Sequence, residues 1–200
     1  TKAQMAGFTE TKLRGRILIA GLRLRQRPIA VVDLDARTAP FPTPIAGVIG
    51  ADLLSPYVVD VRFSPCRVAI RRPGQARRFP AVEVLAMSAA RGPATVRAAV
   101  ADGPHAQAGV MVLSTGSDAP VRLYQRVAGA WGTKELLLPY DEHRANLRAL
   151  SLGGALFENV PAGLLADGPS DRLGMIGAPI LSRWRVRFDF PGRRVLLATP

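Results

Sequence analysis

The chain has 200 residues, of which 48% are hydrophobic, and a net charge of +12 at pH 7. This composition is typical of one large or two small globular domains, and no apolar run is long enough for a membrane-spanning helix. The basic residues are almost all arginine and are spread along the chain, and only 6% of residues are aromatic. Because base-stacking platforms need aromatic side chains, we expect no nucleic-acid partner, while an acidic partner or membrane headgroups stay open.

Short apolar runs rich in β-branched residues, separated by glycine and proline, predict a mostly β chain. In chain order the runs are 16–21, 28–34, 57–63, 66–70, 81–87, 108–113 and 194–198. Single helical turns are expected at 51–57 and 178–184, and the best helix candidate is 141–150.

Two further residues carry expectations of their own. Cys66 is the only cysteine, which excludes a disulfide framework and a cysteine-based zinc site. We expect it to be a small buried residue. Asp52 precedes an apolar stretch and is expected to be a helix N-cap rather than a catalytic acid.

The sequence also repeats itself. Residues 47–70 and 174–197 align without a gap at an offset of 127 and are identical at ten of 24 positions. Residues 17–32 also match 149–164, where Gly21 corresponds to Gly154 and Pro28 to Pro161, both at an offset of 133. Two copies of one pattern in the same order predict two related lobes.

The offsets also predict where the lobes lie. We assign residues 1–72 to the C-terminal part of a first lobe, 73–80 to a basic linker, and 81–200 to a second lobe. The first-lobe counterpart of Ser114 would fall before Thr1, so the first lobe is expected to be incomplete in this chain.

One loop of the second lobe stands out. An apolar strand ends at Ser114-Thr115-Gly116-Ser117, and a Gly-Met-Ile-Gly segment begins 60 residues after Ser114. With the repeat, this resembles the aspartic proteases, most of all bacterial retropepsin-like and pepsin-like proteins with two lobes in one chain. In that family the strand ends in Asp-Thr-Gly or Asp-Ser-Gly, and a Gly-rich segment of this kind follows.

The resemblance implies an all-β, bilobal fold and peptide-bond hydrolysis that needs no metal and no cofactor. It implies an extended peptide or protein substrate, bound between the lobes and covered by flaps. It also implies export, for instance to a bacterial periplasm.

Residue by residue, the catalytic position of the second lobe falls on Ser114, followed by Thr115 and Gly116. Ser117, Trp131 and Gly132 would contact substrate, the last two in a flap at 128–135. The alternatives that stay open are a plain tight turn at the loop and a hairpin aromatic at Trp131.

The substitution at Ser114 bears on activity. The family uses two facing carboxylates that share one proton, and a serine hydroxyl does not ionise near neutral pH. We therefore expect an aspartyl protease-like protein with impaired catalysis, or a non-catalytic peptide-binding module. Asp118, four residues on, could replace the missing acid only if the loop were rebuilt.

A serine hydrolase is a less favoured alternative, because Ser114 would then need a nearby base. His105 and His143 are the only histidines, and both are expected in surface loops. The Gly-x-Ser-x-Gly elbow of many hydrolases is absent as well.

Overall fold

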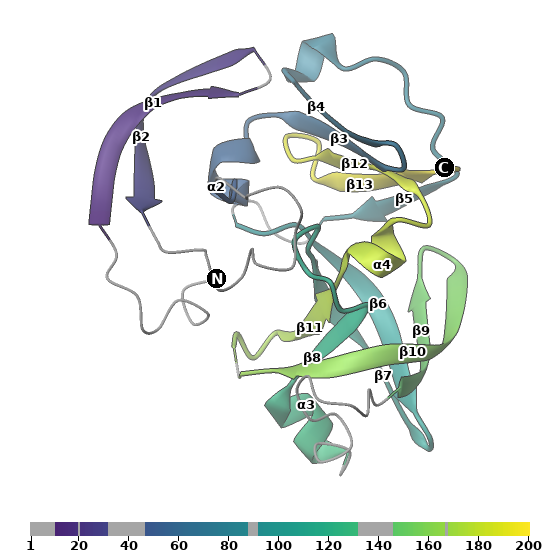
Figure 1. Cartoon of the computed structure of the whole chain (residues 1–200). Helices are drawn as coiled ribbons and strands as arrows, with labels where there is room; N and C mark the ends of the chain where they lie inside the picture. The colour runs from purple at the N-terminus through teal and green to yellow at the C-terminus, as the bar shows by residue number, and fades with distance from the viewer. Residues whose placement is uncertain (1–10, 20, 32–46, 88–91, 132–145, 167) are drawn as a thin grey trace. The chain divides into compact units, whose positions relative to one another are not determined.

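The structure, a computed structural model, describes residues 11–19, 21–31, 47–87, 92–131, 146–166 and 168–200. Strands dominate these residues, which confirms the all-β class expected from the sequence (Figure 1). The chain divides into two compact units, Thr1–Ile49 and Gly50–Pro200.

In the first unit, β1 (Thr11–Ile19) and β2 (Leu22–Val31) form an antiparallel hairpin. Gly21, in the turn, has a φ of 81°, a left-handed value that glycine adopts without steric cost. The expected run at 16–21 therefore lies in β1 and its turn, and the run at 28–34 lies in β2 as far as Val31, the last described residue of that run.

In the second unit, six strands close a barrel in the order β10-β8-β11-β7-β6-β9. Their bounds are β6 (Thr95–Asp102), β7 (His105–Leu113), β8 (Val121–Tyr124), β9 (Asn146–Leu152), β10 (Ala155–Leu165) and β11 (Arg172–Ile176). Along β6, buried Val96, Ala98 and Val100 alternate with more accessible residues, the two-residue period of a half-buried strand. Their side chains belong to the hydrophobic core of the unit.

The other sheet of this unit has five strands in the order β4-β3-β12-β13-β5. Their bounds are β3 (Val58–Phe63), β4 (Cys66–Arg71), β5 (Glu83–Ala86), β12 (Arg185–Asp189) and β13 (Arg194–Ala198). One face packs on the core through buried Val59, Val186 and Leu197. The other face carries charged side chains, among them Asp60 and Arg187.

The short helices are α2 (Ala51–Leu54), the 3-10 turn η2 (Pro73–Gln75), α3 (Gln125–Ala130) and α4 (Ala178–Leu181). The helical turns expected at 51–57 and 178–184 are confirmed. Among the described residues, no helix is both long and apolar enough to cross a bilayer.

Three local expectations are wrong. The expected helix at 141–150 is β9 from Asn146 onward, because this segment pairs with β10 on one side and β6 on the other. Asp52 is not the N-cap of α2; Gly50 is, and Asp52 lies in the first turn. Cys66 is exposed, because it opens β4 at the edge of its sheet.

The repeated segments have matching local structure. The helices α2 and α4 begin 127 residues apart, and so do β3 and β12. The hairpins β1–β2 and β9–β10 align at the second offset, and both Gly21 and Gly154 have a positive φ. The lobe and linker boundaries at 72 and 80 stay predictions, since strands from both sides of this segment share the five-stranded sheet.

Candidate functional site

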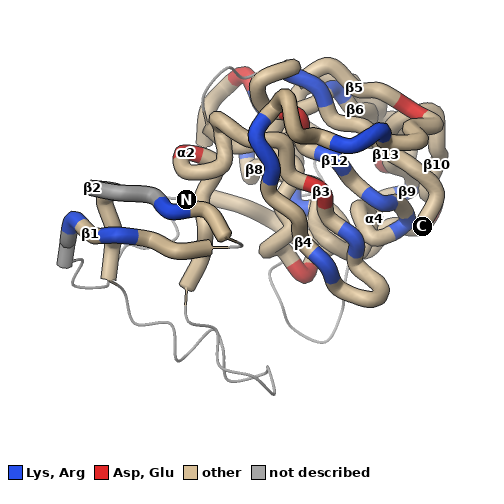
Figure 2. Tube along the Cα trace, turned by 90° about the horizontal axis from the view of Figure 1, so that it is seen from above, with Lys and Arg blue, Asp and Glu red and all other residues tan. Residues whose placement is uncertain are grey.

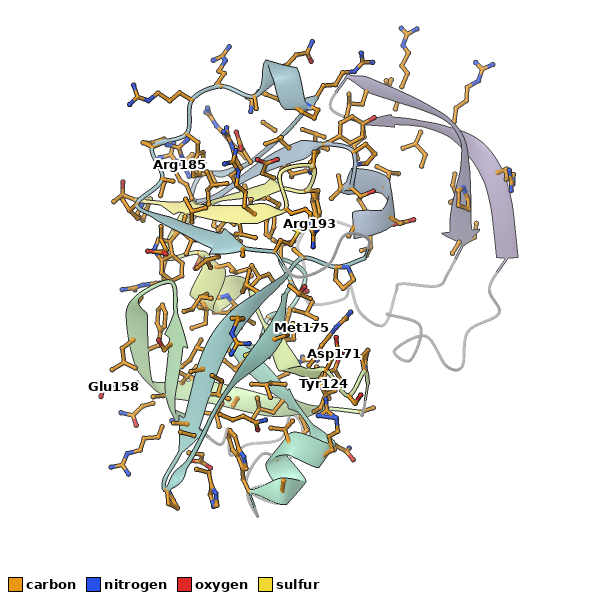
Figure 3. The ribbon with its side chains drawn as sticks, turned by 180° about the vertical axis from the view of Figure 1, so that it is seen from behind. Tyr124, Glu158, Asp171, Met175, Arg185 and Arg193 are labelled. Carbon is orange, nitrogen blue, oxygen red and sulfur yellow. The ribbon has the colours of Figure 1, made fainter. Side chains whose placement is uncertain are left out.

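The candidate site is the loop 114–120, which leaves β7 and enters β8. These two strands are not neighbours, because β11 lies between them, parallel to β7 and antiparallel to β8. Met175, labelled in Figure 3, marks this central strand. The loop therefore has to cross the end of β11, where Ile176 pairs with both Leu113 and Val121.

Backbone hydrogen bonds hold the loop across that strand end. The Ser114 amide donates to the Ile176 carbonyl at 2.9 Å, and the Gly177 amide donates to Pro120 at 2.9 Å. The Ala178 amide, in the first turn of α4, donates to the Ser117 carbonyl at 2.9 Å. The position of Ser114 is thus fixed from β11 and α4 as well as from its own strand.

The Gly-Met-Ile-Gly segment is required by this crossing. A Cβ on Gly174 would overlap the Arg122 carbonyl oxygen, and a Cβ on Gly177 would overlap that of Ala119. No side chain larger than hydrogen fits at either place without a shift of backbone. The two glycines of this segment therefore have a steric cause.

The loop residues differ in exposure. Ser114 is half-buried, whereas Thr115 and Gly116 are exposed. Ser117 is 8% exposed, and its hydroxyl donates to the Ala119 carbonyl at 3.3 Å. The hydroxyl of Ser117 thus stabilises the loop, and its contact with a substrate stays a prediction.

Asp118 supplies the carboxylate of the loop. Its side chain is 69% exposed and accepts a hydrogen bond from Arg122 at 3.1 Å. Asp118 and Arg122 thus form an ion pair at the surface, where the chain enters β8. For Asp118 to replace the missing catalytic acid, the loop would have to adopt a different conformation from the one described here.

His105 lies far from Ser114. It is exposed and is the first residue of β7, not part of a loop, while Ser114 follows the last residue of that strand. Nine residues of extended strand span roughly 30 Å, too far for a general base. His143 lies outside the described residues.

Trp131 is placed with His105 rather than with the loop. It is the C-cap of α3, so 125–130 is helical where an arm of the expected flap would begin. Its ring stacks on that of His105, with centroids 6.2 Å apart and planes 7° from parallel. Gly132 and the rest of the segment 132–135 lie outside the described residues, and their role in a flap stays a prediction.

The described residues contain no group of three or more His, Cys, Asp and Glu side chains arranged to hold a metal ion. The candidate site offers hydroxyl groups, backbone amides and the exposed Asp118 carboxylate in the loop that joins β7 to β8.

Two solved structures are similar to this chain. An aspartic proteinase from Irpex lacteus aligns over 96% of this chain and 78% of its own length, at 14% identity and a TM-score of 0.53. The fold is aspartic-protease-like. A retropepsin-like aspartic protease from Rickettsia conorii aligns over 61% of this chain and 96% of its own, at 16% identity and a TM-score of 0.43. No protein-family model and no curated protein sequence matches the chain.

Two features of this aspartic-protease-like fold were not expected from the sequence. Thr95 pairs with Val112 beneath the loop, and its hydroxyl is buried with no hydrogen-bond partner among the described residues. Asp60 and Arg187 form a bidentate pair across β3 and β12. These two residues are aligned with each other in the repeat, so opposite charges at matched positions were the available signal.

Proposed function

We propose that the chain is an aspartyl protease-like protein that binds extended peptides and is impaired in cleaving them. The observation that carries the proposal is the place of Ser114. It is the first residue after β7 and is tied to β11 through its amide. The resemblance assigns the aspartate of the family motif to this position. The aspartic-protease-like fold supports carrying that motif onto this loop.

The chemistry follows from the residue type. An aspartic protease needs two carboxylates that share a proton, one to activate water and one to polarise the scissile carbonyl. A serine hydroxyl at one of the two positions cannot take up the proton of the attacking water. With serine at position 114, two carboxylates are not available to share a proton, whatever the other lobe contributes.

Peptide binding does not need the carboxylate. An extended peptide binds to exposed strand edges and loops through its own backbone N–H and C=O groups. The loop and strand ends described above keep their geometry with serine at position 114, because the backbone amide holds them. Binding can therefore persist where hydrolysis does not.

The test is fluorescence polarisation with a set of labelled extended peptides, and with matched peptides N-methylated at alternate residues. We expect micromolar or tighter binding of some unmodified peptides and its loss on N-methylation, because methylation removes the donors for strand pairing. Absence of binding across the set, or equal binding of the methylated peptides, would overturn the proposal.

A further inference from the structure

The five-stranded sheet has a charged outer face, which we call the arginine face. Figure 2 shows basic residues along several of its strands and along the segment that follows β4. Alternation along the paired strands places six arginines on this face, and three more lie in the segment that crosses it. They are Arg62, Arg67, Arg71, Arg185, Arg187 and Arg194 on the strands, and Arg72, Arg77 and Arg78 in the segment. Against these nine cations the same face carries two carboxylates, Asp60 and Asp189.

At the centre of the arginine face, Arg187 is buried and two arginines share one carboxylate. Arg187 is 7% exposed and donates to Asp60 through two nitrogens and to the Arg77 carbonyl through a third. Arg71 donates to the same carboxylate at 2.8 Å. The Phe79 ring lies 4.5 Å from the Arg187 guanidinium. This centre is a structural element that fastens the crossing segment to the sheet.

The periphery of the arginine face is different. Arg62, Arg67, Arg72, Arg77 and Arg78 are exposed, and none has an ion-pair partner among the residues that the structure describes. These positive charges increase the electrostatic potential of one surface of the unit.

One pair of residues on this periphery shows the excess of positive charge most clearly. Arg62 and Arg67 lie directly opposite each other in β3 and β4. Their counterparts 127 residues later, Asp189 and Arg194, lie opposite each other in β12 and β13 and form an ion pair of 2.8 Å. Like charges in directly opposed positions destabilise a sheet, and the second copy avoids this cost. The first copy carries an additional cation at the position where the second has an acid.

The surroundings indicate the kind of partner. Arginine binds phosphate oxygens with its planar fork, so a phosphate-bearing partner fits. Phe79, the aromatic residue at the centre, already has the guanidinium groups of Arg185 and Arg187 against its ring. Val84, on the same face, and Val82 beside it are 53% and 62% exposed. A face that carries both exposed cations and exposed aliphatic side chains matches a phospholipid surface better than a nucleic acid.

We propose that the arginine face docks on membranes that contain anionic phospholipids. The exposed arginines would lie at the level of the headgroup phosphates, and the exposed valines at β5 would meet the membrane at the sheet edge opposite to β4. Each arginine near such a surface contributes about fivefold to the affinity.

The test is flotation of the protein with vesicles of phosphatidylcholine, and with vesicles of an equal mixture of phosphatidylcholine and phosphatidylglycerol. We expect binding to the mixed vesicles alone, and a loss of binding as salt is raised. No binding to the mixed vesicles at low salt would overturn the proposal. So would tighter binding to a DNA or RNA duplex under the same conditions.

The informative variant is Arg62→Asp, which reproduces the Asp189–Arg194 pair in the first copy. It should not lower the thermal midpoint, because a repulsive pair becomes attractive, so a loss of binding cannot come from unfolding. The substitution lowers the net charge of the face by two. At about fivefold for each charge, we expect about 25-fold weaker binding to the mixed vesicles.

The matched control is Arg97→Asp on β6 of the barrel, an exposed site with the same change in net charge. We expect its binding to stay within about threefold of wild type, since charges beyond a Debye length are screened. Equal losses in both variants would show that net charge and not this face is responsible, and would overturn the proposal.

Discussion

Asp60 and Arg187 are 127 residues apart in the sequence and lie directly opposite each other in β3 and β12. The offset equals that of the sequence repeat, so each residue faces its own counterpart. Val59 pairs with Phe188 on one side of them, and the counterparts of these two residues, Val186 and Val61, pair on the other side. The local twofold relation of the repeated strands therefore passes through this ion pair. We propose that an internal duplication produced this arrangement.

The pair predicts a large effect of single substitutions. Asp60→Ala leaves the buried Arg187 guanidinium without its carboxylate, and we expect a loss of about 3 kcal/mol in the free energy of unfolding. The double variant Asp60→Leu/Arg187→Leu removes both charges and should lie within about 1 kcal/mol of wild type. Urea unfolding of the wild type and these two variants measures both values. A double variant no more stable than Asp60→Ala would contradict this explanation.

A second prediction concerns the glycine before the loop crossing. Gly174→Ala places a methyl group against the Arg122 carbonyl, and we expect a loss of about 3 kcal/mol or more. The control is its repeat counterpart Gly47, where a Cβ has no neighbour within 4 Å. Gly47→Ala should change stability by no more than about 0.5 kcal/mol. Thermal unfolding distinguishes the two, and similar midpoints would refute the steric account of the motif.

The buried hydroxyl of Thr95 leads to a third prediction. Thr95 is 1% exposed and its oxygen has no partner among the described residues, which costs free energy. Thr95→Val keeps the shape and removes the polar atom, so we expect about 1 kcal/mol of added stability. Thr95→Ser, which keeps the hydroxyl and loses the methyl group, should be less stable than wild type. A destabilised valine variant in chemical denaturation would show that the hydroxyl is bonded after all.

Trp131 provides a fourth prediction. Its ring stacks on His105 at the end of β7 remote from Ser114, so Trp131→Leu should lower stability by about 1 kcal/mol. Peptide affinity should stay unchanged, as measured by fluorescence polarisation. The control is Trp184→Leu, which removes the T-shaped contact with Phe157. A marked loss of peptide affinity in Trp131→Leu alone would instead support the substrate contact inferred from the sequence.

Much of the fold follows from local sequence. Short apolar runs between glycines and prolines predict the strands, and the repeat predicts α2 and α4 at matching positions. The segment from Asn146 does not follow from local sequence, because its helical spacing is outweighed by pairing on both sides with distant strands. Cys66 is exposed because β4 lies at the edge of its sheet, and the order of strands in a sheet cannot be read from the apolar run 66–70 alone.

The local parts of the candidate site are predictable from the sequence, and its long-range pairings are not. The Ser114 loop and the Gly-rich segment were found from their spacing, and the structure supplies the cause, a loop crossing the end of β11. The pairing of Asp60 with Arg187 depends on how two distant strands align, which no local pattern determines. The placement of Trp131 beside His105 has the same origin.

The central claim is that Ser114 leaves a peptide-binding loop without hydrolytic activity. Mass spectrometry of a peptide mixture incubated with the protein and with its Ser114→Ala variant, from acidic to neutral pH, tests it most directly. The account predicts intact peptides with both proteins. Cleavage by the wild type that the alanine variant abolishes would identify Ser114 as a nucleophile and contradict the account. Cleavage that survives the substitution would contradict it as well, because hydrolysis would then proceed without a group at this position.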